Sequence, residues 1–275
     1  MQNQWNKLRR GDGVTASDLF AGRDRGYWSG IDLGRMEQKI GCCGFPVARD
    51  RYYQYFDVVE LQRTFYQPPD LPTIQKLREC SPPGFEFSLK AWQLITHPPT
   101  SPTYRKLRLS IPKKTKKNYG FFKPTDEVLG AWRRVDEISQ VLEAKVIVFQ
   151  CPASFTPTQE NKKNLRRFFL SIKRRNYTFC WELRGEWADR DVESLCKELD
   201  LVHCVDPFKS EPTFGKIRYF RLHGIGGYRY RYTEDDLRNL KAKDFKSPRV
   251  YYMFNNVYMF EDARRFKEMM SRLIL

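Results

Sequence analysis

The sequence predicts an α/β fold, a (β/α)8 barrel of the TIM type with an N-terminal extension and one long basic loop after the third strand. Three observations predict it. Eight short strand-like runs alternate with segments of helical spacing along the chain, which is typical of a parallel sheet. The length of 275 residues suits a barrel of this kind, which usually has about 250 residues. A hydrophobic fraction of 41%, with six Trp, can fill its core.

The predicted strands are short runs rich in β-branched and aromatic residues. They lie at 39–44, 57–61, 85–90, 145–150, 177–183, 201–206, 217–223 and 249–256. Helical spacing predicts helices at 48–56, 70–80, 125–144, 158–175, 189–199, 233–242 and 260–273. The segment 207–216 is short and interrupted by proline, so we expect no good helix there.

Two segments fall outside this alternation. Residues 1–38 carry turn formers and charges without a sustained period. We therefore expect an N-terminal extension, followed by the barrel domain at 39–275. Residues 98–123 form a long connection that contains no acidic residue, and unstructured loops of this length are usually functional or mobile.

Composition narrows the class of protein. No apolar run approaches the ~18 residues that cross a bilayer, and the polar start lacks a secretory signal. We therefore expect a cytoplasmic protein without a membrane partner. Seven Cys without CxxC spacing indicate reduced core thiols rather than disulfides. A net charge of +16 should attract anionic partners.

Basic residues beside aromatic ones suggest nucleic acid as one such partner. This combination suits phosphate contact and base stacking. The loop at 98–123 contains Lys113, Lys114, Lys116 and Lys117 together with Tyr104, Tyr119, Phe121 and Phe122. The run YRYRY at 228–232 adds Arg229 and Arg231 as candidate phosphate contacts. A solvated basic loop without a ligand is the alternative.

Side chains alternate along a strand, so position in the strand predicts which ones face the barrel interior. In the strand at 217–223, Phe220 and Leu222 share an apolar face that must meet the helices. Arg221 and His223 therefore point inward.

The same alternation places polar residues at the C-terminal ends of the other strands, where this fold builds its active sites. These residues are Glu60, Gln62, Lys90, Gln150, Glu182 and Asp206. Below them, the barrel floor is expected to hold Val58, Val146, Val202 and Ile217. An unpaired buried charge is costly, so these groups either form a structural ion-pair network or await a charged ligand in a pocket. Both alternatives are open.

Six motifs span the ends of the predicted strands: FDVVELQRTFYQPP at 56–69, FSLKAWQLITH at 87–97, VFQCPASF at 148–155, CWELRGEW at 180–187, RLHG at 221–224 and YMFNN at 252–256. Together they resemble the YecE-like family, catalogued as domain of unknown function 72. The resemblance implies a TIM-type barrel and no settled activity. Gln62 stands where the family usually has Asn, and Cys42 and Cys43 stand where it tends to have two small residues such as Thr-Ser.

The first functional hypothesis is an enzyme, a hydrolase or phosphoester-processing one, acting on a phosphorylated or other anionic substrate, nucleic acid included. The candidate roles are anion binding by Lys90, Arg184 and Arg221, proton abstraction by Glu60 or Glu182, proton donation by His223 or His97, and substrate contacts from Gln150, Asp206, Asn255 and Asn256. No residue is assigned to a metal. The cofactor is unknown, although a single divalent metal held by Glu60, Glu182 or Asp206 stays open.

Two other functions are open. One is non-catalytic nucleic-acid binding through the loop at 98–123 and the YRYRY run. The other is glycoside hydrolysis by paired carboxylates, Glu60 with Glu182 or Asp206.

Overall fold

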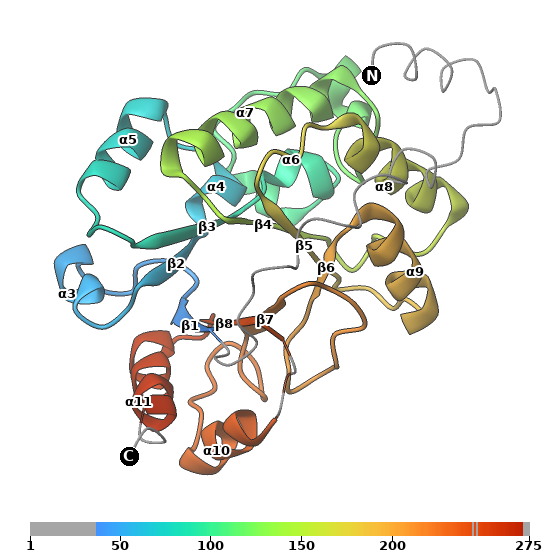
Figure 1. Cartoon of the computed structure of the whole chain (residues 1–275). Coiled ribbons are helices and arrows are strands. Elements are labelled where there is room, and N and C mark those ends of the chain that lie inside the picture. Colours follow the sequence, from blue (N-terminus) through green and yellow to red (C-terminus); the bar gives the residue numbers. More distant parts are fainter. Residues whose placement is uncertain (1–36, 244, 246, 272–275) are drawn as a thin grey trace, which may run out of the picture. The chain divides into compact units, whose positions relative to one another are not determined.

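Eight parallel strands form one sheet that curves into a barrel (Figure 1). The structure is a computed structural model that describes residues 37–243, 245 and 247–271. The strands are β1 (Glu37–Cys42), β2 (Val58–Leu61), β3 (Glu86–Lys90), β4 (Val146–Gln150), β5 (Thr178–Glu182), β6 (Val202–Cys204), β7 (Arg218–Leu222) and β8 (Arg249–Phe254). All eight predicted strands are confirmed, with small shifts of their ends.

The strand order is β6-β5-β4-β3-β2-β1-β8-β7, which leaves β6 and β7 to meet. Within the described part of the chain, one isolated parallel bridge joins Val205 to Phe220, and the Arg221 N–H donates to the Val205 carbonyl at 3.0 Å. The barrel is therefore nearly closed, with a short seam between β6 and β7.

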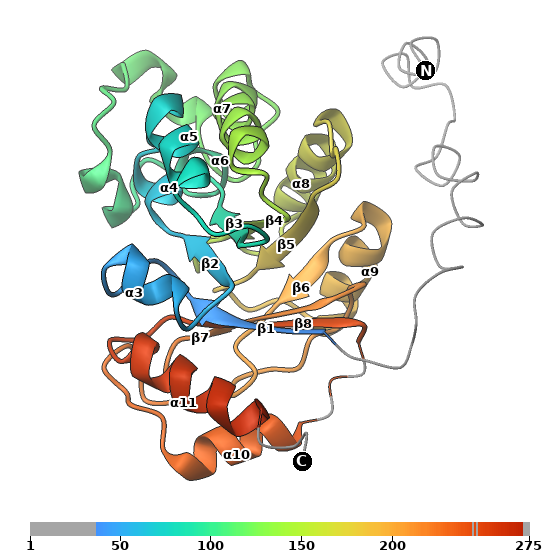
Figure 2. The ribbon, with the colours of Figure 1, turned by 60° about the vertical axis from the view of Figure 1, so that its left-hand side comes forward.

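Helices surround the strands, as the second view shows (Figure 2). The longer ones are α3 (Arg49–Tyr53), α5 (Leu71–Glu79), α7 (Asp126–Leu142), α8 (Gln159–Ser171), α9 (Asp189–Leu199), α10 (Glu234–Ala242) and α11 (Met259–Ser271). Each corresponds to a predicted helix. Side-chain caps fix several of their starts. Thr125 accepts from the Val128 N–H at α7, and Thr233 forms a capping box with Asp236 at α10.

Two separate apolar clusters confirm the predicted alternation of faces. The inner cluster contains Val58, Val146, Val202 and Tyr219, with Ile217 packed against it. The outer cluster joins the opposite faces of the strands to the helices, and it includes Phe220 and Leu222. The strands are thus apolar on both sides, and polar groups concentrate near their C-terminal ends.

The connection from β3 to α7 is more ordered than the sequence predicts. It contains α6 (Gln93–Thr96) and two 3-10 helices, η1 (Pro102–Lys106) and η2 (Lys113–Asn118), while α4 (Arg63–Tyr66) follows β2. Phe122 is fully buried, so its expected role in base stacking is wrong. Gly120 has φ +80, and a Cβ there would lie 2.4 Å from the His97 carbonyl oxygen. This glycine therefore allows the connection to pass close to His97.

The predicted N-terminal extension falls outside the described residues except at its end. Residues 37 and 38, assigned to the extension, instead begin β1. In the described ranges, no helix is long and apolar enough to cross a membrane.

Candidate functional site

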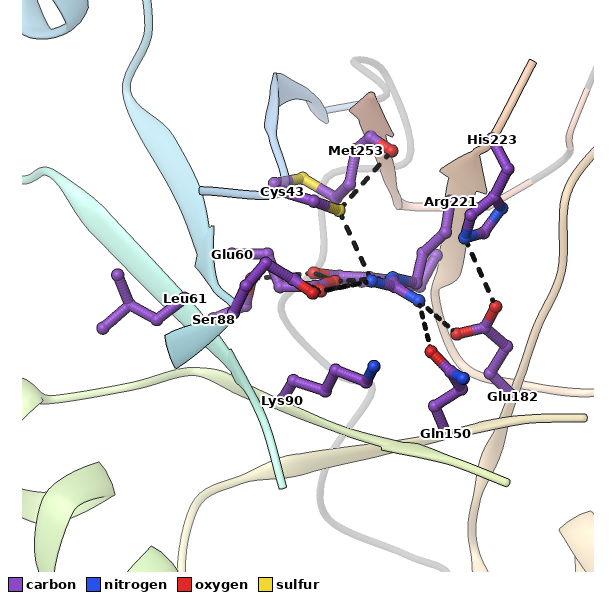
Figure 3. Close-up of polar contacts among 12 residues, drawn as sticks. Cys43, Glu60, Leu61, Ser88, Lys90, Gln150, Glu182, Arg221, His223 and Met253 are labelled. Atoms are coloured by element: carbon purple, nitrogen blue, oxygen red, sulfur yellow. Dashed lines mark hydrogen bonds and ion pairs between the residues drawn. The ribbon is translucent and has the colours of Figure 1, made fainter. Parts of the chain in front are cut away.

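Arg221 lies at the centre of the polar groups inside the barrel (Figure 3). It is the fourth residue of β7, and its side chain is 0% exposed. Its Nε donates to Glu60 Oε2 at 3.1 Å, and its Nη2 lies 2.9 Å from Glu60 Oε1. A planar guanidinium and a carboxylate fit this two-point contact. Glu60, from β2, is also 0% exposed.

The remaining donors of Arg221 also contact protein groups. Nη1 lies 2.5 Å from Glu182 Oε2 and 3.3 Å from Gln150 Oε1. Nη2 donates to Gln62 Oε1 at 3.3 Å and contacts Cys43 Sγ at 3.7 Å. The guanidinium has no donor left for a substrate, because its five N–H groups already face acceptors. The expectation that Arg221 binds the substrate anion directly is therefore wrong.

This arrangement holds Glu182 as a carboxylate. Burial would raise the pKa of Glu182, but the charges of Arg221 and Arg184 outweigh it and lower that pKa to about 2. Arg184 Nη2 lies 2.8 Å from Glu182 Oε1. Glu60 accepts a further hydrogen bond from the Tyr219 hydroxyl at 2.9 Å, and Tyr219 is bonded to Ser88 at 2.7 Å.

His223 lies between the acidic and basic groups beside the seam. Its Nε2 is 2.6 Å from Arg184 Nη2, and its Nδ1 is 3.5 Å from Asp206 Oδ2. Because the arginine donates, Nε2 accepts, which places the ring proton on Nδ1. Burial lowers the pKa of His223, and this outweighs the opposing effect of Asp206. Asp206 also accepts from the His223 backbone N–H at 3.1 Å.

Lys90 differs from these paired groups. It is the last residue of β3 and only 5% exposed, and its Nζ lies 3.6 Å from the centre of the Phe65 ring. No hydrogen bond or ion pair joins Nζ to any residue in the described ranges. Burial, and after it the charge of Arg221, lowers the pKa of Lys90 to about 7, although Glu182 and Glu60 oppose this change.

A cavity of about 540 Å³ opens above Lys90 at the C-terminal ends of β1 to β4 and β8. Its wall is formed by Cys43, Gln62, Phe65, Tyr66, Lys90, His97, Thr103, Lys106, Gln150, Tyr228 and Asn255. None of these lining residues is acidic. The cavity therefore presents amines, amides and aromatic rings, while the carboxylates of Glu60 and Glu182 are turned to Arg221.

His97 faces the cavity as a neutral imidazole. Its Nδ1 lies 2.8 Å from Thr96 Oγ1, and its ring packs edge-on against Phe65 at 4.9 Å. Burial, and after it the charge of Lys90, lowers the pKa of His97 to about 3. A protonated His97 acting as an acid at neutral pH is therefore not expected.

The two adjacent asparagines have different positions. Asn255 lines the cavity. Asn256 is 0% exposed, and its amide donates to the Tyr230 carbonyl at 2.8 Å and to Asp262 at 2.7 Å. The expected substrate contact of Asn256 is wrong, because its side chain joins the β7–α10 loop to α11 instead.

The candidate nucleic-acid residues lie outside the cavity. Lys113, Lys114, Lys116 and Lys117 are exposed on η2, and Arg229 and Arg231 are exposed in the β7–α10 loop. Of the three tyrosines in YRYRY, Tyr232 is buried and accepts from the Gly224 N–H. Tyr230 donates to Asp236 at 2.7 Å. These two rings serve the loop's own packing.

The described residues contain no group of three or more His, Cys, Asp or Glu side chains placed to hold a metal ion. Glu60, Glu182 and Asp206 were the candidate ligands. Glu60 and Glu182 face arginine, and Asp206 accepts from two backbone N–H groups. All seven cysteines are free, and only Cys80 among them is exposed.

The sequence predicted most of the polar cluster and missed part of the cavity. The structure brings together Glu60, Lys90, Gln150, Glu182, Arg184, Asp206, Arg221 and His223. Lys106, Thr103 and Cys43 were not assigned to the site. Lys106 lies in the basic connection, and its Nζ is 4.4 Å from the Tyr66 ring centre. In the sequence, only the excess of basic residues in this connection indicated that Lys106 could belong to the site.

Comparison with known proteins identifies the same architecture. The family described as "Protein of unknown function DUF72" matches residues 49–274. No curated protein matches the chain. A crystal structure of a DUF72 family protein from Thermotoga maritima shares 22% identity with a TM-score of 0.64, covering 86% of this chain and 99% of that one. A DUF72 family protein from Enterococcus faecalis shares 17% identity with a TM-score of 0.65, covering 86% and 98%.

Proposed function

This chain belongs to the DUF72 family, whose function is not known, and we propose that it is an enzyme acting on a small phosphorylated or otherwise anionic substrate at the barrel mouth. The observation that carries the proposal is the buried Lys90 amine. It faces a cavity of about 540 Å³, and no described acidic residue pairs with it. A buried ammonium without a counter-ion is costly, and a bound anion would remove that cost.

The surroundings of Lys90 support an anionic ligand. Lys106 adds a second positive charge at the cavity wall, and the lining includes no carboxylate. Gln150 gives its amide oxygen to Arg221, which leaves its NH2 group to donate to a ligand. Asn255 offers a further amide. Charge-assisted and amide hydrogen bonds of this kind hold phosphate and carboxylate oxygens.

Anion binding is tested with inorganic phosphate. We expect phosphate to raise the thermal midpoint of the wild-type protein, and Lys106→Met to weaken phosphate binding by about tenfold, the effect of losing one charged contact. Lys76→Met, which removes an exposed lysine from α5, is the matched control and should bind phosphate as the wild type does. Equal phosphate affinity in all three proteins, or no binding at millimolar phosphate, overturns the proposal.

Activity is tested separately on a panel of phosphorylated and carboxylated small molecules. Turnover that disappears in Lys90→Met, in a protein that still folds, supports catalysis at this site. The polar cluster offers poor support for glycoside hydrolysis, because a general acid needs a raised pKa and that of Glu182 is about 2.

Nucleic-acid binding is a second candidate, favoured by the four exposed lysines of η2. Binding of this kind weakens steeply with salt. We expect the variant with Lys113, Lys114, Lys116 and Lys117 changed to Ala to bind single-stranded RNA or DNA more weakly, with a shallower salt dependence. An unchanged affinity and salt slope would exclude this face.

A cytoplasmic location is part of the proposal. The free state of all seven cysteines fits a reducing compartment.

A further inference from the structure

We infer that Lys90 is a nucleophile that forms an imine with the carbonyl carbon of a small aldehyde or ketone carrying an anionic group. The inference rests on the proposed function, since the same cavity must hold the anionic part of the substrate.

The position of Lys90 suits a nucleophile better than a binding residue alone. A lysine that only attracts anions works well on an exposed surface, where Lys106 lies. Lys90 is 5% exposed and lies against the Phe65 ring. The Thr64 hydroxyl donates to its backbone carbonyl at 2.7 Å, which fixes the strand end. The amine is thus held at the base of the cavity without an acceptor among the described residues.

Burial favours the neutral amine of Lys90, and the charge of Arg221 adds to this effect. Arg221 on β7 and Arg184 after β5 are positive, whereas Glu60 and Glu182 are already paired with arginine. His97, after α6, is neutral. This environment lowers the pKa of Lys90 to about 7, so a large fraction of the amine is unprotonated at neutral pH. Reactive lysines in other enzymes are prepared in the same way, by desolvation and a neighbouring cation.

The step balances with groups that the cavity holds. The amine lone pair attacks the carbonyl carbon, a proton passes from nitrogen to the carbonyl oxygen, and a carbinolamine forms. The hydroxyl group then takes up the remaining proton of the nitrogen and leaves as water, and the nitrogen lone pair forms the carbon–nitrogen double bond of a neutral imine at Lys90. His97 lines the same cavity with Nδ1 bonded to Thr96. Its Nε2 is therefore left to hydrogen-bond the departing hydroxyl.

The cavity also suits the anionic group. Lys106 and the amide of Asn255 line it, and Gln150 adds a free NH2 group. A volume of about 540 Å³ admits a small molecule. The substrate class is therefore a small carbonyl compound bearing a phosphate or carboxylate.

Reductive trapping tests the inference on the wild-type protein. The protein is incubated at neutral pH with sodium cyanoborohydride and one of three probes: glycolaldehyde phosphate, glyoxylate, or uncharged glycolaldehyde. Peptide mass spectrometry then locates the adducts. We expect about one adduct per chain, at Lys90, forming at least about tenfold faster with a charged probe than with glycolaldehyde, the factor for one added charged contact. The faster charged probe identifies phosphate or carboxylate as the favoured group.

Three variants complete the test. Lys90→Arg keeps a positive charge but cannot form a reducible imine, and Lys90→Met removes the amine. Both should lose the adduct, while Lys76→Arg should keep it. Excess inorganic phosphate should slow trapping in the wild type.

The outcomes separate this inference from the proposed function. Phosphate binding that depends on Lys106, without any adduct at Lys90, overturns the imine and leaves the anion site standing. If the adduct at Lys90 forms as fast with glycolaldehyde as with the charged probes, and added phosphate does not slow it, the anionic substrate class is overturned. Adducts spread over exposed lysines, with none enriched at Lys90, overturn the inference as a whole.

Discussion

Arg221 stabilises the barrel mouth because one side chain satisfies two buried carboxylates. Its bidentate contact with Glu60 and its contact with Glu182 use the fixed fork of the guanidinium, which a lysine does not have. The cluster therefore contains the ion-pair network that the sequence left open as an alternative. The pocket that was the other alternative lies beside it, at Lys90.

Removing Arg221 should strongly destabilise the protein. We expect Arg221→Met to lower the free energy of unfolding by about 3–5 kcal/mol, because it leaves Glu60 buried without a counter-ion and Glu182 paired with Arg184 alone. Urea unfolding at pH 7 measures the change. In the triple variant, Glu60→Gln and Glu182→Gln accompany Arg221→Met, and most of the loss should be recovered. A triple variant no more stable than the single one would contradict this account.

Lys90 should make stability depend on pH in the opposite sense to an ion-paired lysine, whose pKa is raised by folding. Its folded pKa of about 7 is below the ordinary value of 10.5, so between these values the unfolded chain binds a proton that the folded chain does not. Wild-type stability should then rise with pH by up to about 1.4 kcal/mol per unit for this one group. Lys90→Met should lack this contribution and be more stable at pH 7.

Unfolding of the wild type and Lys90→Met across pH 7 to 10 measures that difference, and Lys76→Met is the control for an exposed lysine. The gap between wild type and Lys90→Met should narrow as pH rises. Parallel curves would show that the Lys90 amine does not titrate in this range.

At the scale of single residues, alternation along strands predicted the interior position of Glu60, Lys90, Glu182 and Arg221. It could not predict which cation would pair with the carboxylates, because that depends on distances across the barrel. The alternation also ends where the strand ends. Asn255 therefore faces the cavity while the next residue turns towards α11.

Among the elements, the β3–α7 connection has the most influence on the cavity. It supplies His97, Thr103 and Lys106 to the wall, and the Gly120 N–H donates to the Leu94 carbonyl at 2.9 Å. The sequence predicted this segment as an unstructured loop. Short 3-10 helices such as η1 and η2 have too few residues to show a hydrophobic period, so their order could not be predicted.

Gly120 should be intolerant of any side chain. Gly120→Ala places a Cβ against the His97 carbonyl at a backbone φ of +80, so we expect a loss of about 1–3 kcal/mol and a weaker phosphate response. Gly130 lies inside α7, where a Cβ meets only Arg133 Nη2 at 3.5 Å. Gly130→Ala should therefore gain up to about 1 kcal/mol. Equal effects of the two changes on the thermal midpoint would contradict the close approach.

For the molecule as a whole, the number of strands and their parallel direction followed from the sequence, but the weak point of the barrel did not. β6 ends at Cys204 after three residues, and no helix occupies 207–216. The proline-interrupted segment predicted the missing helix. The short pairing between β6 and β7 depends on the register of the closed sheet, which local composition does not encode.

Amide hydrogen exchange should be uneven around the barrel. The β1–β8 pairing is continuous from Glu37–Arg249 to Cys42–Phe254, whereas one bridge joins Val205 to Phe220 among the described residues. We expect amides along the seam, including that of Arg221, to exchange faster than those of β8, because they open with less loss of structure. Arg221→Met should increase the difference in exchange rate between the seam and β8. Equal protection of the amides in all strands would contradict this prediction.

The burial of six of the seven cysteines has a practical consequence for all of these measurements. Cys80 follows α5 and precedes β3, at the face opposite the mouth, so a maleimide dye or a nitroxide should attach at that position of the native sequence. Such a label could report ligand binding, unfolding or distance changes without any engineered cysteine. The native sequence therefore allows spectroscopic labelling at a single site, Cys80.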